Sequence, residues 1–309
     1  MIFEGFDGRA AGLWGTQPLR LRHTLSGLDL FSDGSLARLV EQLPGTHLQI
    51  NTAGSVGANT WSACDRGGRT GAEVLEAVRG GRLWINMMGL EEVDRRFADL
   101  VARIYAEIEE GVPGLRTSRH RIGVLVSSPG ARVHYHTDVP CQTLWQLRGR
   151  KRIWVYPPTE PFLRGPEIED VVRRVSEEGI SYEPWFDEYA RVHDLEAGDM
   201  LHWPLNAPHR IVNDDVVNVS LTTEHWTAPS RRAYLVHFGN GVLRSDLGWR
   251  PRSRSTAGPG LLAKAGLATA YRLSGLRHRR TAVRTATHVV DPLAGGGARR
   301  LVDAPRPVV

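Results

Sequence analysis

Cysteine is scarce in this chain of 309 residues, which holds only two, Cys64 and Cys141. Two cysteines exclude a disulfide-rich scaffold, and their spacing matches no zinc motif. No apolar run reaches the roughly 20 residues that cross a bilayer. The first residues, MIFEGFDGRAAGLWG, include Glu4 and Asp7 and do not have the basic start and apolar core of a secretory signal. These absences predict a reduced, cytoplasmic protein without a transmembrane segment.

The charges are divided unevenly along the chain. Hydrophobic content of 41% and charged content of 24% are ordinary for a globular protein, and the net charge is +5. From residue 231 onward, fifteen Arg or Lys stand against three acids, a net charge of +12, which leaves −7 for residues 1–230. This segregation predicts an acidic body with a basic arm. The arm is expected either to dock on the body or to hold an anionic partner such as nucleic acid, acidic protein or a membrane surface.

Residues 1–115 have the pattern of an α/β portion. Apolar residues recur at helical spacing in three segments, and short apolar runs indicate strands between them. We expect helices at Leu28–Leu43, Gly71–Val78 and Leu90–Ile108, strands at His47–Ile50 and Arg82–Met88, and a loop at Ala53–Thr70.

Residues 116–228 are predicted to form the core, interrupted at 160–196 by an insertion. A strand at Arg121–Val126 begins the core, and the insertion is acidic, with a helix expected at Glu167–Glu178. The acids of the insertion are expected to form either a solvated face or an electrostatic guide for a cationic substrate.

Residues 229–309 form the basic extension. An amphipathic helix is expected at Leu261–Leu276, and Thr281–Val309 is expected to be mobile. The apolar side of this helix is predicted to consist of Leu262, Ala265, Thr269, Leu273 and Leu276.

The most informative stretch is Val133–Pro158, VHYHTDVPCQTLWQLRGRKRIWVYPP. His136 and Asp138 are two residues apart, so on a strand both side chains point to one face and can reach one metal ion. His209, which follows one apolar strand and precedes another, is the best candidate for a third ligand; His134, on the same face, is the competitor. Two His and one carboxylate leave coordination positions open, as in non-haem Fe(II) oxygenases.

A lysine follows this pair at an informative distance. Lys151 lies thirteen residues after Asp138, just past Leu-Arg-Gly-Arg. We expect this turn to form a hairpin that returns the strand beside the preceding one and points Lys151 toward the metal. An ammonium there would bind the far carboxylate of a dicarboxylic co-substrate that chelates the iron.

These residues resemble the JmjC/cupin-like Fe(II)- and 2-oxoglutarate-dependent oxygenases, close in pattern to the asparaginyl-hydroxylase branch. The resemblance covers residues 120–228 and includes His136, Asp138, Lys151, Pro157-Pro158 and His209. By alignment with that branch, Gln142 is also expected to contact the co-substrate. Two positions depart from the pattern: Val133 replaces a Thr, and Glu224 replaces an amide.

The fold class implied by the resemblance is mainly β with flanking α, a double-stranded β-helix (jelly-roll, cupin) core with an α/β amino-terminal part. Fe(II) on His136, Asp138 and His209 would use 2-oxoglutarate and O2 to hydroxylate a C–H bond of a protein, peptide or small-molecule substrate. Three alternatives stay open: a cupin-type metalloenzyme that does not use 2-oxoglutarate, a binding protein for nucleic acid or anionic surfaces, and a catalytically dead cupin scaffold. Substrate and oligomeric state do not follow from the sequence.

Overall fold

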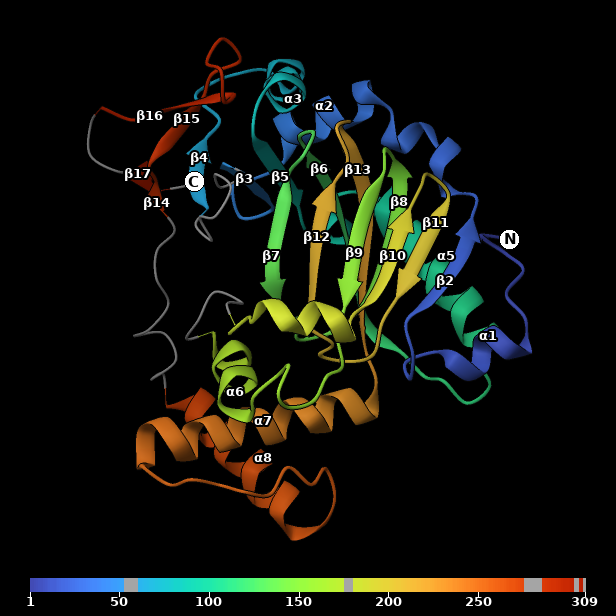
Figure 1. The fold of residues 1–309 in the computed structure, drawn as a ribbon, viewed down its shortest axis with the longest axis vertical. Helices are drawn as coiled ribbons and strands as arrows, with labels where there is room; N and C mark the ends of the chain where they lie inside the picture. Colours follow the sequence, from blue (N-terminus) through green and yellow to red (C-terminus); the bar gives the residue numbers. More distant parts are fainter. Residues whose placement is uncertain (53–60, 175–179, 275–284, 303–305, 308–309) are drawn as a thin grey trace.

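Two sheets, antiparallel except for one parallel pair of strands, pack face to face at the centre of the molecule (Figure 1). The computed structural model describes residues 1–52, 61–174, 180–274, 285–302 and 306–307. The minor sheet has the order β10 (Arg191–Leu195), β9 (Lys151–Val155), β12 (His209–Asn213) and β7 (Arg132–His136). The major sheet has the order β1 (Phe3–Glu4), β2 (Leu19–His23), β11 (Asp199–His202), β8 (Cys141–Arg148), β13 (Asn218–Trp226), β6 (Ser118–Ser127), β5 (Leu83–Met87), β3 (Leu48–Thr52), β4 (Ser62–Asp65), β15 (His288–Val290) and β16 (Ala298–Arg300). A two-stranded sheet pairs β14 (Thr285–Ala286) with β17 (Arg306–Pro307).

Helices cover the outer face of the major sheet and one end of the sandwich. The α-helices are α1 (Gly8–Leu13), α2 (Asp33–Gln42), α3 (Gly71–Gly80), α4 (Leu90–Val93), α5 (Arg95–Gly111), α6 (Gly165–Arg173), α7 (Ala228–Leu247) and α8 (Gly258–Leu273). The 3-10 turns found among the described residues are η1 (Leu25–Gly27), η2 (Asp29–Phe31) and η3 (Pro184–Tyr189). Within the described part of the chain, no helix combines the length and apolarity needed to cross a membrane.

Strand alternation assigns the side chains of β8 to two different cores. Trp145 faces the larger core, which the amino-terminal helices close with Phe97 and Ile104 among others. Its neighbour Leu144 faces the space between the two sheets, where it packs with Ile153 of β9. One strand therefore contributes to the amino-terminal portion on one face and to the interior of the sandwich on the other.

The predicted hairpin at Leu-Arg-Gly-Arg is wrong. β8 pairs with β11 and β13 in the major sheet, whereas β9 pairs with β10 and β12 in the minor sheet. The tight turn at Gly149, with φ of +80°, carries the chain from one sheet to the other. Loop length alone does not distinguish a hairpin from such a crossing, since both reverse the chain.

The helices and strands expected for the amino-terminal third are present, with two differences. The helix predicted at Leu90–Ile108 is two helices, because Asp94 leaves the helical conformation and its carboxylate caps the amino end of α5. The loop predicted at Ala53–Thr70 contains β4, which pairs with β3; residues 53–60 lie outside the described part. The major sheet therefore runs without interruption from the core into the amino-terminal portion.

The insertion is shorter than the predicted range 160–196. Residues 191–195 form β10 and pair with β9, so they belong to the minor sheet. The predicted helix Glu167–Glu178 corresponds to α6, which ends at Arg173, and residues 175–179 lie outside the described part. In Figure 1 the segment containing η3 crosses the lower ends of β7 and β9.

The basic extension packs on the insertion. α7 contacts α6 and α8 (Figure 1). Two ion pairs, each with one buried partner, join Arg173 to Asp246 at 2.5 Å and Arg244 to Glu169 at 2.7 Å. Charged residues of the extension thus pair with the insertion, one of the two placements expected for the arm.

The predicted buried side of the second helix of the extension is wrong. α8 packs on α7 through Lys264 and Ala268, while Leu262 and Leu273 are exposed; Leu276 lies outside the described part. Both sides of α8 carry leucines, so periodicity alone could not identify the buried one.

The final segment is not the mobile tail that was expected, as far as it is described. β15 pairs in parallel with β4, and β16 pairs with β15. Val289 packs so tightly on Gly67 that a Cβ there would lie 2.4 Å from its Cγ2 atom. The chain returns to extend the sheet of its own amino-terminal portion.

Candidate metal centre

Three side chains with metal-ligand chemistry meet at one end of the minor sheet. His136 is the last residue of β7 and His209 is the first of β12, and these two residues pair directly across the strands. Asp138 follows β7 by two residues, and its Oδ2 lies 3.4 Å from His209 Nε2. One ligand atom from each residue lies within 4.8 Å of the other two. This is the geometry of a three-ligand metal site with one open side.

Backbone carbonyls orient both imidazoles. Nδ1 of His136 donates to the His134 carbonyl at 2.8 Å, and Nδ1 of His209 donates to the Ala207 carbonyl at 3.1 Å. A carbonyl oxygen only accepts, so each Nδ1 carries the proton and each Nε2 is left as a lone-pair donor. A hydrogen bond from the other ring nitrogen is the usual support of a metal-bound His.

Thr137, between the two ligands of the HxD motif, fixes their loop. Its hydroxyl donates to the carbonyl of Asn206 at 2.8 Å, and Asn206 has a left-handed φ of +59°. The loop that carries Asp138 is thereby tied to the loop that precedes His209. The sequence analysis did not single out Thr137, because a small hydroxyl residue beside the motif gives no signal of its own.

Burial favours the neutral form of the His209 imidazole. His136 and His209 are buried, and the Trp203 ring lies 4.5 Å from that of His209. Burial and, secondarily, the His136 imidazole hold the pKa of His209 well below its usual range. Neutral imidazole is the ligand form, and two nitrogens with one carboxylate fit Fe(II) by donor chemistry.

His134 lies outside this group. Its ring centroid is 6.5 Å from that of His136 and 4.4 Å from that of Trp61, and it contributes its carbonyl rather than its ring. His202 and His225 lie on the opposite face of the major sheet, where His202 stacks on Trp14 with a centroid distance of 4.0 Å. They are core residues.

Lys151 points into the sandwich interior from the other end of β9. The burial of alternate residues places Lys151 on the same face as Ile153 and Val155, which contribute to the core between the sheets. Among the described residues no hydrogen bond or ion pair of its ammonium is found, and burial lowers its pKa to about 7. Burial of an ammonium without a partner costs free energy. Such an ammonium is expected where the protein binds an anionic ligand.

Gln142 lies on the inner face of β8, opposite Glu224 of β13. Its amide donates to the Glu224 carboxylate at 3.3 Å. Arg121 also interacts with Glu224: against the effect of burial, Glu91 and Glu92 and, to a smaller extent, Glu224 raise the pKa of this arginine. The anion that departs from the family pattern is therefore balanced by neighbours, and Gln142 is partly engaged by it.

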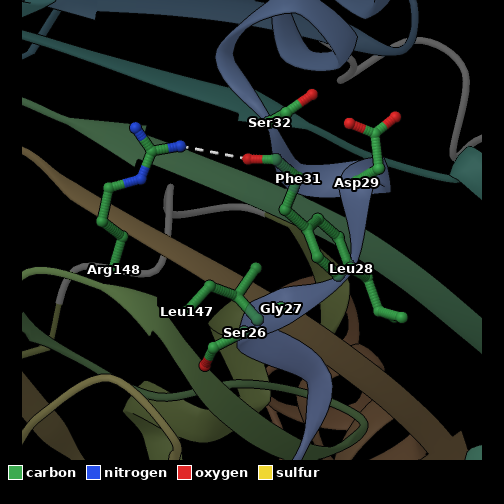
Figure 2. Close-up of a pocket in the computed structure, with 8 residues that line it drawn as sticks. All are labelled: Ser26, Gly27, Leu28, Asp29, Phe31, Ser32, Leu147 and Arg148. Carbon is green, nitrogen blue, oxygen red and sulfur yellow. Dashed lines mark hydrogen bonds between the residues drawn. The ribbon is translucent and has the colours of Figure 1, made fainter.

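The pocket drawn in Figure 2 is a separate feature. It measures about 390 Å³ and lies between η1, η2 and the last residues of β8, where Arg148 donates to the Phe31 carbonyl at 3.0 Å. β8 begins near the Asp138 loop and ends at this pocket, so the pocket lies at the opposite end of the strand from the triad.

Comparison with known proteins supports the fold. No protein-family model matches the chain. The X-ray structure of Escherichia coli YcfD is similar with a TM-score of 0.51 and 18% identity, over 90% of this chain and 71% of that one. Another YcfD structure, described as a ribosomal oxygenase in complex with cobalt and 2-oxoglutarate, gives 0.47 and 18%, over 86% and 66%.

One curated sequence is also similar. Human tRNA wybutosine-synthesizing protein 5 is 30% identical over 105 residues, a match that spans 32% of this chain and 33% of the human protein. At 18% identity, the likeness to YcfD establishes a shared fold. The resemblance to the JmjC/cupin-like oxygenases that the sequence predicts is confirmed at that level.

Proposed function

We propose that the protein is an Fe(II)- and 2-oxoglutarate-dependent dioxygenase that hydroxylates a C–H bond of its substrate. Its core would be a double-stranded β-helix made of β6–β13, two sheets joined by crossings such as that from β8 to β9. His136, Asp138 and His209 are the proposed metal ligands, Lys151 the proposed anchor of the co-substrate, and Gln142 a proposed contact of it.

The observation that carries this proposal is the meeting of the three ligand atoms within 4.8 Å, with both Nδ1 atoms bound to carbonyls. His136 and His209 come from separate strands, and Asp138 comes from a loop held by Thr137. Two buried histidines that bind no metal would not need to carry the proton on Nδ1 in both rings and to turn both Nε2 atoms toward the Asp138 carboxylate.

A ferrous ion with 2-oxoglutarate and O2 supplies the oxidation, in which the co-substrate becomes succinate and CO2. The residues of the chain bind and orient. The two imidazoles and Asp138 would hold three positions on one side, and the apolar residues Ile153 and Val155 exclude water between the sheets. Lys151 would bind the far carboxylate of the co-substrate and so fix its direction.

Lys151 also separates this proposal from its alternatives. A cupin-type enzyme that does not use 2-oxoglutarate has no need of a buried ammonium without an acidic partner.

The proposed oxygenase function does not depend on an anionic partner of the basic extension, which is a separate proposal. Two arginines of the extension, Arg244 and Arg254, already pair with Glu169 and Glu160 of the same chain. The chain holds only two cysteines, and we propose a reducing, cytoplasmic setting.

The test is anaerobic addition of Fe(II) and 2-oxoglutarate to the metal-free protein. A visible charge-transfer band is expected, followed by succinate formation when air is admitted. A protein that binds Fe(II) but develops no band and forms no succinate, with wild-type folding verified by circular dichroism, would exclude the 2-oxoglutarate function and leave the other metalloenzyme class.

A further inference from the structure

Three large aromatic side chains are exposed within a short stretch of the insertion. Tyr182, Trp185 and Tyr189 are 38%, 45% and 59% exposed. The rings of Trp185 and Tyr189 lie 5.9 Å apart, and all three surround the buried ring of Phe186 or its neighbour Phe162. Contiguous exposed aromatic surface of this kind is uncommon on a soluble protein and marks an interaction site.

The stretch is held in place rather than loosely attached. Phe186 is 1% exposed and packs edge-on against Phe162 at 5.0 Å. The hydroxyl of Tyr182 donates to Asp187 at 3.0 Å, and Tyr156 of the core donates to the same carboxylate. A partner would therefore meet rings that are already ordered, which lowers the entropic cost of binding.

The charge beside these rings is negative. Glu183 and Glu188 are exposed and alternate with the aromatic residues. Neither makes an ion pair with any residue that the structure describes, and residues 1–230 carry a net charge of −7. Carboxylates next to exposed ring faces complement a cation and repel a phosphate backbone.

One guanidinium is already bound in this manner where the insertion meets β9 of the minor sheet. Arg210 of β12 lies over the Trp154 ring at 3.5 Å from its centroid, and its guanidinium pairs with Asp187 of η3. This intramolecular contact combines a ring face with a carboxylate, and the exposed rings beside Glu183 and Glu188 repeat the combination on the surface.

The patch lies next to the triad. Tyr135 of β7 contacts Tyr182 at 5.3 Å, and it precedes His136 in the chain. Alternation on β7 directs Tyr135 to the insertion and His136 to the interior, so the two sites lie on opposite faces of the same strand end. Only the end of β7 separates the patch from the candidate metal site, so an extended substrate segment bound on the patch can continue around this strand end to the metal.

We propose that Tyr182, Glu183, Trp185, Glu188 and Tyr189 form a docking surface for an arginine- or lysine-rich polypeptide segment of the substrate. This names a substrate class for the site and so rests on the proposed oxygenase function. Arginine suits the surface best, because its planar guanidinium stacks on rings while it donates to carboxylates. The residue to be oxidised would lie close to the docked segment in the sequence of the substrate protein.

The experiment measures fluorescence anisotropy of a fluorescein-labelled peptide of alternating arginine and glycine, mixed with the full chain. Binding is expected, with weakening of about tenfold for the Trp185→Ala/Tyr189→Ala double variant, since stacked aromatic residues dominate such contacts. Glu183→Lys/Glu188→Lys is expected to weaken binding at least as much and to flatten its salt dependence. The matched controls Trp249→Ala and Asp215→Lys change an exposed Trp and an exposed acid elsewhere and are expected to bind as wild type.

Several outcomes overturn the proposal. Unchanged peptide affinity in both patch variants does so, and so does equal or tighter binding of a glutamate–glycine peptide or of single-stranded RNA. The measurement is repeated with His136→Ala, which removes a proposed metal ligand but no patch residue, and unchanged peptide affinity is expected. Peptide binding without 2-oxoglutarate turnover would refute the oxygenase function alone, whereas turnover without peptide binding would refute the docking surface alone.

Discussion

Lys151 and His209 lie on the same face of the minor sheet, at opposite ends of the β9–β12 ladder. His209 is paired with Val155 and Lys151 with Asn213. Lys151 and Val155, the residue paired with His209, are four residues apart along β9. At about 3.3 Å per residue, their Cα atoms are about 13 Å apart. The side chains point into the same interior from both ends, which leaves between them a span that a chelated dicarboxylate can bridge.

The first prediction concerns Lys151→Met. Loss of a charge-assisted hydrogen bond in a buried site is expected to weaken 2-oxoglutarate binding about tenfold to a hundredfold, without loss of Fe(II). Isothermal titration under anaerobic conditions measures both. The control is Arg150→Met, which removes a neighbouring cation that pairs with Glu196 on the surface. Equal loss of affinity in the two variants would mean that general charge, not the Lys151 anchor, holds the co-substrate.

The same variant is expected to be more stable than wild type in the absence of ligand. Burial lowers the pKa of Lys151 from 10.5 to about 7, so the folded state binds the proton less tightly than the unfolded state. The resulting penalty is fully present below about pH 7 and disappears as pH rises toward 10.5. Lys151→Met removes it, with an expected gain on the order of 1 kcal/mol in chemical denaturation at pH 7. A loss of stability would indicate that the ammonium has a structural partner.

The second prediction is a pH dependence of co-substrate affinity. A bound carboxylate favours the charged ammonium, so binding above about pH 7 must be accompanied by proton uptake at Lys151. Affinity for 2-oxoglutarate is expected to fall as pH rises from 7 to 9, by up to about tenfold per pH unit. 2-Oxobutyrate, which chelates a metal in the same way but has no far carboxylate, is the comparison. A similar decline for both compounds would assign the effect to the metal site.

The third prediction separates the histidines of the HxD region. His136→Ala and His209→Ala are each expected to abolish stoichiometric Fe(II) binding, measured by metal analysis after gel filtration. His134→Ala is expected to retain the metal, because His134 supports His136 through its backbone carbonyl, which the substitution preserves. Iron retained by His209→Ala would remove that residue from the ligand set.

The sequence predicted which three residues meet at the candidate site, but it did not predict the path of the chain. The types and spacing of His136, Asp138 and His209 indicate metal-ligand chemistry, so the triad could be proposed without knowledge of the sheets. The crossing at Gly149 could not, since the turn looks the same whether the next strand joins the same sheet or the facing one. The docked face of α8 was also hidden, because leucines lie on both sides and the choice depends on what α7 presents.

The fourth prediction uses this contact between α7 and α8. A Cβ at Gly239 would lie 2.7 Å from Cβ and 3.0 Å from Cα of Lys264, and backbone atoms cannot move aside as a flexible side chain can. Gly239→Ala is therefore expected to force the helices apart and destabilise the extension by about 1–3 kcal/mol, although alanine is the better helix former.

Gly266→Ala is the matched control, since Gly266 lies within α8 with no atom near the added methyl. That variant is expected to stabilise the chain by roughly 0.5–1 kcal/mol. Thermal melting of the two variants, with limited proteolysis of the extension, measures the difference. Equal stabilisation by both substitutions would mean that α8 does not pack on α7 as closely as the structure places it.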